Sequence, residues 1–190
     1  LDSPVAILSF MKKNFSRIFA AQPYALAGHI VSVEVDITNG LHAFSIVGLP
    51  DTAVSEARDR VASAIKNSGF TSPKQENHKT VVSLAPAELR KEGSYFDLAI
   101  ALGYMLSNEE IKFDPEGKIF LGELALNGET KPLKGILSLV KSAKDLGFQE
   151  IFVPEKNARE AALIEDIKIF AVKNLIEVID HLDDKKEFKI

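Results

Sequence analysis

Apolar and polar residues alternate in the first half of the chain in a pattern typical of β-strands. Residues 30–38 alternate with a period of two, which predicts a half-buried strand. Asn39-Gly40 follows this segment and is the strongest short signal for a hairpin, so residues 43–47 are predicted to return as its partner strand. Residues 80–85 form an apolar run that predicts a buried strand.

Two segments in this half have helical character. The segment after Asp51 repeats apolar residues at helical spacing, which predicts a helix that Asp51 caps and that ends near Gly69. Its apolar face consists of Val54, Ala57, Val61 and Ile65. Residues 95–106 are apolar almost all round, which predicts a central and fully buried helix.

The second half alternates strands with helices. Residues 120–126 and 129–133 are predicted to pair as a hairpin around Asn127-Gly128. A helix over 136–146, a strand over 150–153 and a strand over 167–172 follow. Asn157 and Asn174 are each followed three residues later by glutamate, so both are predicted to cap helices, the second over 174–182. Hairpins followed by β-α alternation predict an α+β or mixed α/β class.

The domain boundaries follow from the ends of this pattern. Residues 11–182 are predicted to form a single domain, because no long linker or repeat interrupts them. Residues 1–10 precede the first methionine and are interpreted as an extension or an artificial addition. Residues 183–190 are charged and predict a linker. Lys12-Lys13 followed by Phe15 weakly resembles the start of a signal peptide, but no long apolar segment comes after it.

Composition narrows the function classes. The chain has 190 residues, of which 46% are hydrophobic and 26% charged, as is ordinary for a globular protein. It has no cysteine, which excludes disulfides and thiolate metal sites and predicts a reducing compartment such as the cytoplasm. No apolar run approaches the roughly 20 residues that span a bilayer, so no membrane association is expected. The net charge of −4 argues against a surface broadly adapted to nucleic acid but allows a local basic patch.

Common catalytic motifs are missing from the sequence. It has neither a P-loop nor a Gly-x-Gly-x-x-Gly fingerprint, so no cofactor site is predicted. No Gly-x-Ser-x-Gly elbow is present either. The histidines lack the spacing of metal ligands, so no metal site is predicted; they are His29, His42, His78 and His181.

The segment 84–98 is the most informative part of the sequence, because it places a charged loop between an apolar strand and an apolar helix. It has three interpretations: an anion-binding turn, a serine nucleophile, or a capped helix start. Ser94-x-x-Asp97 fits a capping box, in which Ser94 and Asp97 satisfy each other's backbone N–H groups. A Ser94–Lys134 dyad is the weaker, catalytic alternative. The cap is the favoured interpretation.

Four cations lie at turns beside predicted helix starts, where backbone N–H groups also attract anions. They are Arg90, Lys91, Lys131 and Lys134. Ordinary solvated surface charge is the alternative interpretation. If the domain binds nucleic acid, we expect these four side chains to contact phosphates, so that neutralising them weakens binding to all sequences alike and reduces its salt dependence.

Several blocks, in the same order, resemble the N-terminal region of the ComM/YifB-type, magnesium-chelatase-like AAA+ ATPases. They are residues 33–37, 44–54, 64–70, 84–98, 121–128 and 153–158. The resemblance implies a ribosomal-protein-S5-domain-2-like fold, related to the Lon protease domain and to the C-terminal domain of RadA. It also implies a bacterial, hexameric helicase that aids branch migration during natural transformation. ATP and Mg²⁺ would then belong to an ATPase module outside this chain.

The kinship with Lon bears on the dyad. Lys131-Pro132-Leu133-Lys134 resembles the Lon motif that ends in the catalytic lysine, which places Lys134 on that lysine, although both glycines of the motif are replaced. When Glu92-Gly93 is aligned with the Asp-Gly of the Lon motif that carries the nucleophile, Tyr95 takes the place of the nucleophilic serine, and Ser94 lies one residue before it. A shift of one residue at a helix start turns a side chain by about 100°. The resemblance therefore implies that the scaffold remains and the peptidase is lost.

The leading hypothesis is a non-catalytic domain of a bacterial AAA+ DNA-processing ATPase, serving ring assembly, DNA guidance or both. A residual Ser/Lys peptidase of the Lon type is the first alternative. A protein-interaction module is the second, because the acidic net charge weakens a role in DNA binding.

We predict that the chain neither binds nor hydrolyses ATP, because it lacks a glycine loop with a lysine and a hydroxyl to hold the phosphates. Isothermal titration calorimetry of the chain with Mg-ATP should give no saturable heat. Tight, saturable binding to residues 11–182 would contradict this prediction.

Overall fold

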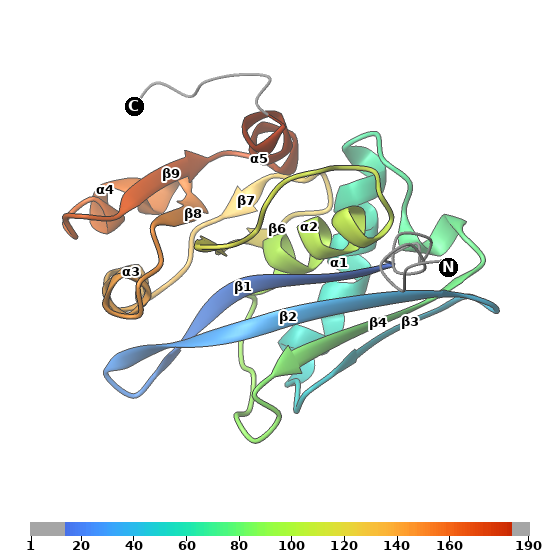
Figure 1. Ribbon diagram of the computed structural model, residues 1–190, viewed down its shortest axis with the longest axis horizontal. Coiled ribbons are helices and arrows are strands. Elements are labelled where there is room, and N and C mark those ends of the chain that lie inside the picture. The colour runs from blue at the N-terminus through green and yellow to red at the C-terminus, as the bar shows by residue number, and fades with distance from the viewer. Residues whose placement is uncertain (1–13, 184–190) are drawn as a thin grey trace, which may run out of the picture.

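The computed structural model describes residues 14–183. Its main sheet has seven strands, and helices α1 (Thr52–Asn67) and α2 (Asp97–Ser107) lie beside it (Figure 1). Its strand order is β3 (Ala43–Val47), β4 (His78–Ala85), β2 (Ala27–Asn39), β1 (Phe15–Tyr24), β5 (Lys118–Phe120), β8 (Glu150–Pro154) and β9 (Lys168–Val172). The pairs β1–β2 and β2–β4 are antiparallel, and the other four pairs are parallel. The predicted mixed α/β class is confirmed.

Strand β1 lies in the middle of the sheet. No strand is predicted over its residues, 15–24, from the sequence. It pairs with β2 along its whole length, from Phe15 opposite Asp36 to Tyr24 opposite Ala27. Several of its residues are fully buried, including the neighbours Ala20 and Ala21, so both of its faces are covered in part. Covered faces weaken the alternation that identifies a strand. Phe15 and its neighbours therefore belong to the folded domain.

The predicted hairpin between residues 30–38 and 43–47 is also wrong. Both segments are strands, but β3 pairs in parallel with β4, and β4 lies between β3 and β2. At the Asn39-Gly40 turn, the Gly40 N–H donates to the carbonyl of Asn77, next to the start of β4. Strand β4 therefore has a partner on both sides and its Val82 and Leu84 are inaccessible, whereas the half-buried β3 lies at the edge.

The two helices of the first half have the predicted burial. Asp51 caps α1 (Thr52–Asn67) by accepting a 2.7 Å hydrogen bond from the Val54 N–H, and Gly69 follows with a positive φ of 87°. Helix α2 (Asp97–Ser107) contacts β1, β2 and α1 and is almost entirely buried. Its approach to the sheet is close, because the Ser16 hydroxyl donates to the Gly103 carbonyl at 2.7 Å.

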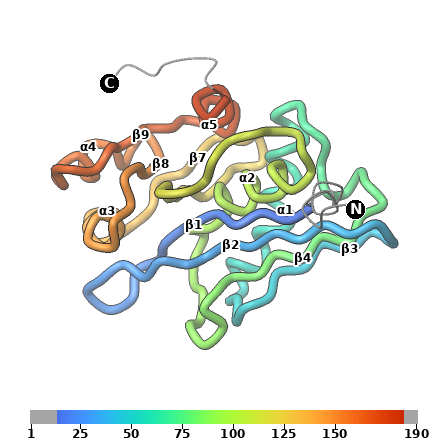
Figure 2. Tube along the Cα trace, viewed as in Figure 1, coloured from blue at the N-terminus to red at the C-terminus, as the bar shows by residue number. Residues whose placement is uncertain are grey.

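The second half contains a short hairpin outside the main sheet. Strands β6 (Glu123–Leu124) and β7 (Thr130–Lys131) pair around Gly128, which confirms the hairpin in a shorter form because β5 joins the main sheet instead. The hairpin is tied to α5 (Leu175–Leu182) by a 2.9 Å bond from the Leu175 N–H to the Gly128 carbonyl. Figure 2 traces the chain through the hairpin and on to α5.

The last elements fit the predicted order with one exception. Helix α3 (Ile136–Asp145) and β8 and β9 lie where expected, and Asn174 caps α5 through the Glu177 N–H at 2.9 Å. Asn157 does not cap α4 (Ala158–Ala161). Its buried amide group instead bonds the backbone N–H and carbonyl of Leu133, at 2.8 and 2.9 Å. The predicted end segment 1–10 lies outside the described residues, as does all of the predicted linker 183–190 except Asp183, which is the C-cap residue of α5.

The turn after β3 generates a testable prediction, because a Cβ added at Gly48 would lie 2.1 Å from the carbonyl oxygen of Leu84. Gly69 has a similar positive φ, but a Cβ there meets nothing within 4 Å. We expect Gly69→Ala to destabilise the fold by about 1–2 kcal/mol through backbone strain alone, and Gly48→Ala by at least twice as much. Urea unfolding of both variants checks this, and equal losses of stability would show that the close approach does not matter.

Candidate functional site

The loop between β4 and α2, residues 86–96, is fixed by a side chain from the centre of the sheet. The amide of Gln22 on β1 donates to the Arg90 carbonyl at 2.8 Å, and its oxygen accepts from the Glu92 N–H at 3.0 Å. Gln22 is 2% exposed, so both bonds form away from competing water. A buried polar group on β1 therefore holds the polar loop by its backbone.

Asp51 fixes the same loop from the start of α1. One carboxylate oxygen caps that helix, and the other accepts a 3.0 Å bond from the N–H of Gly93. The backbone of Lys91 is also paired there, since its N–H donates to Leu49 and its carbonyl accepts from Asp51, at 3.0 and 2.9 Å. Sequence analysis identified Asp51 only as a cap and missed its second role.

Lys91 is not a surface cation, so its prediction as a nucleic-acid contact is wrong. Its side chain is fully buried, and its ammonium group donates to the carbonyl of Pro86 within the same loop. Burial lowers the pKa of Lys91, and the negative charge of Glu88 offsets only part of that effect. Lys91 therefore closes the loop from inside and cannot reach a phosphate.

The predicted capping box of Ser94 and Asp97 is also wrong. Helix α2 begins at Asp97, so its N-cap residue is Phe96, which makes no side-chain cap bond. The Ser94 hydroxyl donates instead to the carboxylate of Glu123 on β6. Because this partner lies 29 residues away, a local pattern cannot reveal it.

Asp97 has a structural role at the centre of the site. Its fully buried carboxylate accepts from Arg60 Nε at 2.7 Å, from Arg60 Nη2 at 3.0 Å and from the Leu124 N–H at 3.1 Å. The hydrogen bond to Asp97 raises the pKa of Arg60, whose guanidinium stays charged. Burial raises the pKa of Asp97 more than Arg60 lowers it. With its oxygens engaged in this way, Asp97 cannot also return to the N-cap.

The two positions that align with the Lon dyad lie in contact, but not as a dyad. The Tyr95 hydroxyl donates to the backbone carbonyl of Lys134 at 3.2 Å. Burial raises the pKa of Tyr95, which keeps the phenol protonated. Within residues 14–183, no hydrogen bond joins Ser94 to the exposed Lys134, so the two do not form a Ser/Lys dyad.

The remaining predicted cations are at the surface. The Arg90 side chain is 70% exposed and lies 3.6 Å from Glu92, and Lys134 is exposed at the turn before α3. Lys131 lies 3.2 Å from Glu129 and lines a polar hollow with two lysines that sequence analysis missed, Lys156 and Lys173. These two lysines follow the ends of β8 and β9, and only the fold brings them to Lys131.

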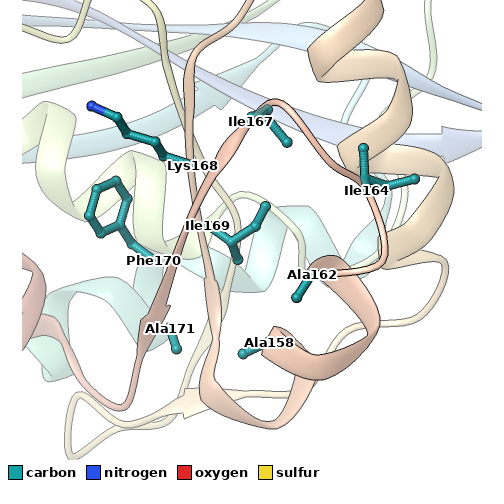
Figure 3. Close-up of a pocket in the computed structure, with 8 residues that line it drawn as sticks. All are labelled: Ala158, Ala162, Ile164, Ile167, Lys168, Ile169, Phe170 and Ala171. Atoms are coloured by element: carbon teal, nitrogen blue, oxygen red, sulfur yellow. The ribbon is translucent and has the colours of Figure 1, made fainter. Parts of the chain in front are cut away.

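A second hollow, of about 400 Å³, lies between α4 and edge strand β9 (Figure 3). Its lining is apolar apart from Lys168, and it carries no pair of groups suited to acid–base or nucleophilic chemistry. In the described part of the chain, no three potential metal ligands come together. No helix between residues 14 and 183 has both the length and the apolar character to cross a membrane.

Lys91→Met tests the buried position of this lysine. The lowered pKa means that the folded state disfavours the charged ammonium form of Lys91. This form predominates at neutral pH, so its cost to the stability of the fold is fully present there. The penalty is lost as the pH rises through the folded pKa towards the ordinary value of 10.5. We expect the stability of the variant relative to the unchanged chain to be highest near pH 7 and to fall towards pH 10. A difference that does not change with pH, in urea unfolding at matched ionic strength, would show that Lys91 is solvated.

The comparisons with known proteins identify the family. A family model described as subunit ChlI of Mg-chelatase matches residues 33–157. The competence protein ComM of Haemophilus influenzae is 31% identical over 91% of this chain and 33% of its own length. An uncharacterised protein YifB of Salmonella typhimurium is 40% identical over 82% of this chain and 30% of its own. Lon protease 2 of Bacillus subtilis is 26% identical over 82% of this chain and 30% of its own length.

The chain thus spans about a third of the length of the curated relatives that it matches. The similarity covers most of this chain and includes the loop and helix that form the site. The chain belongs to the family of the Mg-chelatase subunit ChlI, among its ComM/YifB-type members.

Proposed function

We propose that this chain is a non-catalytic domain of a bacterial, cytoplasmic AAA+ ATPase that processes DNA, and that it guides DNA and supports assembly of a hexameric ring. ATP and Mg²⁺ would be bound by a separate ATPase module. The names of two relatives support a role with DNA: ComM is a competence protein, and a DNA repair protein RadA of Streptococcus pneumoniae is 31% identical over 44% of this chain.

The contacts of Tyr95 are the observation that carries the non-catalytic part of the proposal. A serine at this position would be the nucleophile if the Lon resemblance held in full. Tyr95 is a phenol that donates to the Lys134 carbonyl, while the neighbouring Ser94 is bound to Glu123. In a Ser/Lys dyad the lysine amine accepts the proton of the serine, and within residues 14–183 no hydrogen bond joins Ser94 to Lys134. The contacts of Tyr95 and Ser94 support a structural use of both positions.

Guidance of DNA is supported by the exposed cations near the site. Arg90, Lys131 and Lys134 keep accessible charge, unlike Lys91. Because the chain is acidic overall, DNA binding would depend on exposed cations such as these and not on the net charge. Lysine and arginine contacts to phosphates hold a strand without reading its sequence, which suits an enzyme that moves along DNA.

Ring assembly is supported by the two ends of the sheet. Among the described residues, β3 and β9 each lack a partner strand on one side, and unpaired edges are sites of association. Exposed apolar side chains lie near both, including Leu49 after β3 and Leu163 before β9, which are 56% and 71% exposed. Two unlike surfaces are what a head-to-tail ring contact requires.

We expect the chain to be inert towards peptides and serine-directed reagents. A fluorophosphonate probe should not label Ser94, and casein should remain intact, because Ser94 hydrogen-bonds Glu123 and not the lysine that a Ser/Lys dyad requires. An active Lon protease serves as the positive control and Ser94→Ala as the matched negative control. Labelling that disappears in Ser94→Ala would favour the residual peptidase instead.

We also expect the chain to bind DNA weakly and without sequence preference, with an affinity that falls steeply as salt rises. Fluorescence anisotropy of labelled single strands and duplexes of two unrelated sequences, at several KCl concentrations, measures this. Absence of binding at low salt would remove DNA guidance from this domain and leave ring assembly or protein interaction as its role.

A further inference from the structure

We propose that the hollow lined by Lys131, Lys156 and Lys173, called here the lysine hollow, binds phosphate groups of a nucleic-acid strand. The inference rests on the proposed function and deepens it, because it moves the contact from the predicted loop to a different surface. Only Lys131 among the four predicted cations belongs to the lysine hollow.

The position of the lysine hollow in the fold suits a ligand site. Strands β8 and β9 are parallel and end at Pro154 and Val172. The residues immediately after each end line the lysine hollow, with Lys156 on one side and Lys173 on the other. Ligands of open α/β sheets bind in crevices outside the carboxyl ends of the strands. Lys131 on β7 completes the lining, and the volume is about 350 Å³.

The lysine hollow is preformed, because backbone bonds fix the elements that carry its lysines. The Thr130 N–H donates to the Lys173 carbonyl at 2.8 Å, and its hydroxyl donates to the Val172 carbonyl at 2.7 Å. The N–H of Lys173 is held by the Glu177 carboxylate at 3.0 Å. Strand β7 and the end of β9 therefore form one rigid unit, and a ligand has little backbone ordering to impose.

The charges leave the lysine hollow with a net attraction for anions. Lys131 and Lys173 lie 3.2 and 3.5 Å from Glu129 and Glu155, whereas Lys156 makes no ion pair within the described residues. The hydrogen bond from Lys131 lowers the pKa of Glu129, which stays ionised. Glu129 and Glu155 are more than half exposed, and such pairs contribute little stability, so a phosphate can displace either carboxylate.

The lining favours the phosphates of a strand over a whole nucleotide. Its other residues are Glu129, Thr130, Glu155 and Asn174, and none of the lining is aromatic. Recognition of a base normally includes stacking on an aromatic ring or a guanidinium group. Lysine is a point charge that contacts phosphate without reading a base. The contact is therefore expected to be electrostatic and independent of sequence.

The test compares two triple variants of the chain in anisotropy titrations with a labelled single strand. Lys131→Gln/Lys156→Gln/Lys173→Gln removes the lysine hollow's cations. The matched control Lys74→Gln/Lys79→Gln/Lys141→Gln removes the same charge from exposed lysines elsewhere, of which Lys74 and Lys141 also have carboxylate partners. We expect the first variant to bind at least tenfold more weakly, with a salt slope smaller by about 2, since each lost contact removes about 0.7 from a single-strand slope. The control should change affinity less than threefold.

A third variant changes the affinity in the opposite direction. Glu129→Gln/Glu155→Gln removes the carboxylates that compete for the lysines, so we expect severalfold tighter binding, a gain that misfolding does not produce. Thermal unfolding confirms that each variant is folded.

The outcomes separate the two proposals. If the unchanged chain does not bind DNA, DNA guidance and the lysine hollow proposal both fail. If it binds and the two triple variants weaken binding equally, the lysine hollow proposal fails and DNA guidance stands. Calorimetry with ATP tests whether the lysine hollow binds the phosphates of a free nucleotide instead of those of a nucleic-acid strand. Saturable ATP binding that only the Lys131/Lys156/Lys173 variant loses would assign the hollow to a free nucleotide and overturn the proposal.

Discussion

The carboxylate of Asp97 is the interaction on which the arrangement of the site depends. It is fully buried at the first residue of α2, and it binds Arg60 of α1 and the Leu124 N–H of β6. Removing one partner of such a pair leaves an uncompensated buried charge, which costs about 3–5 kcal/mol. Through Asp97, two helices and the β6–β7 hairpin share one anchor. The hairpin in turn presents Glu123 to Ser94 and Lys131 to the lysine hollow.

The same hydrogen bonds explain how a fold that resembles a peptidase can be stable without a peptidase site. The positions that a Lon-like dyad would use, Tyr95 and Lys134, are in contact, but the hydroxyl groups of Tyr95 and of its neighbour Ser94 each have a structural partner. The buried Lys91 is a further polar group with a structural partner, because its ammonium group donates to the Pro86 carbonyl in the same loop. Polar groups that are satisfied internally hold a loop in one conformation but are not free for a substrate.

Local patterns predicted local features, and long-range contacts account for the errors. The caps at Asp51 and Asn174 and the burial of α2 depend on residues within a few positions, and all are confirmed. The cap at Ser94 fails because its partner Glu123 lies 29 residues away. Strand β3 has the predicted place in the sequence but not the predicted partner, because β4, a later segment of the chain, lies between β3 and β2. The burial of Lys91 and the convergence of Lys156 and Lys173 on Lys131 have no signal in the sequence that we could identify.

The central claim is that the loop of residues 86–96 is a fixed structural unit and not a mobile catalytic loop. Native-state hydrogen exchange measures this directly at the amides of Lys91, Glu92 and Gly93, which are bonded to Leu49, Gln22 and Asp51. The account predicts that all three amides exchange as slowly as those of buried α2, opening only with the whole fold. Exchange at nearly the rate of an unfolded peptide would contradict it, because the loop would then open on its own.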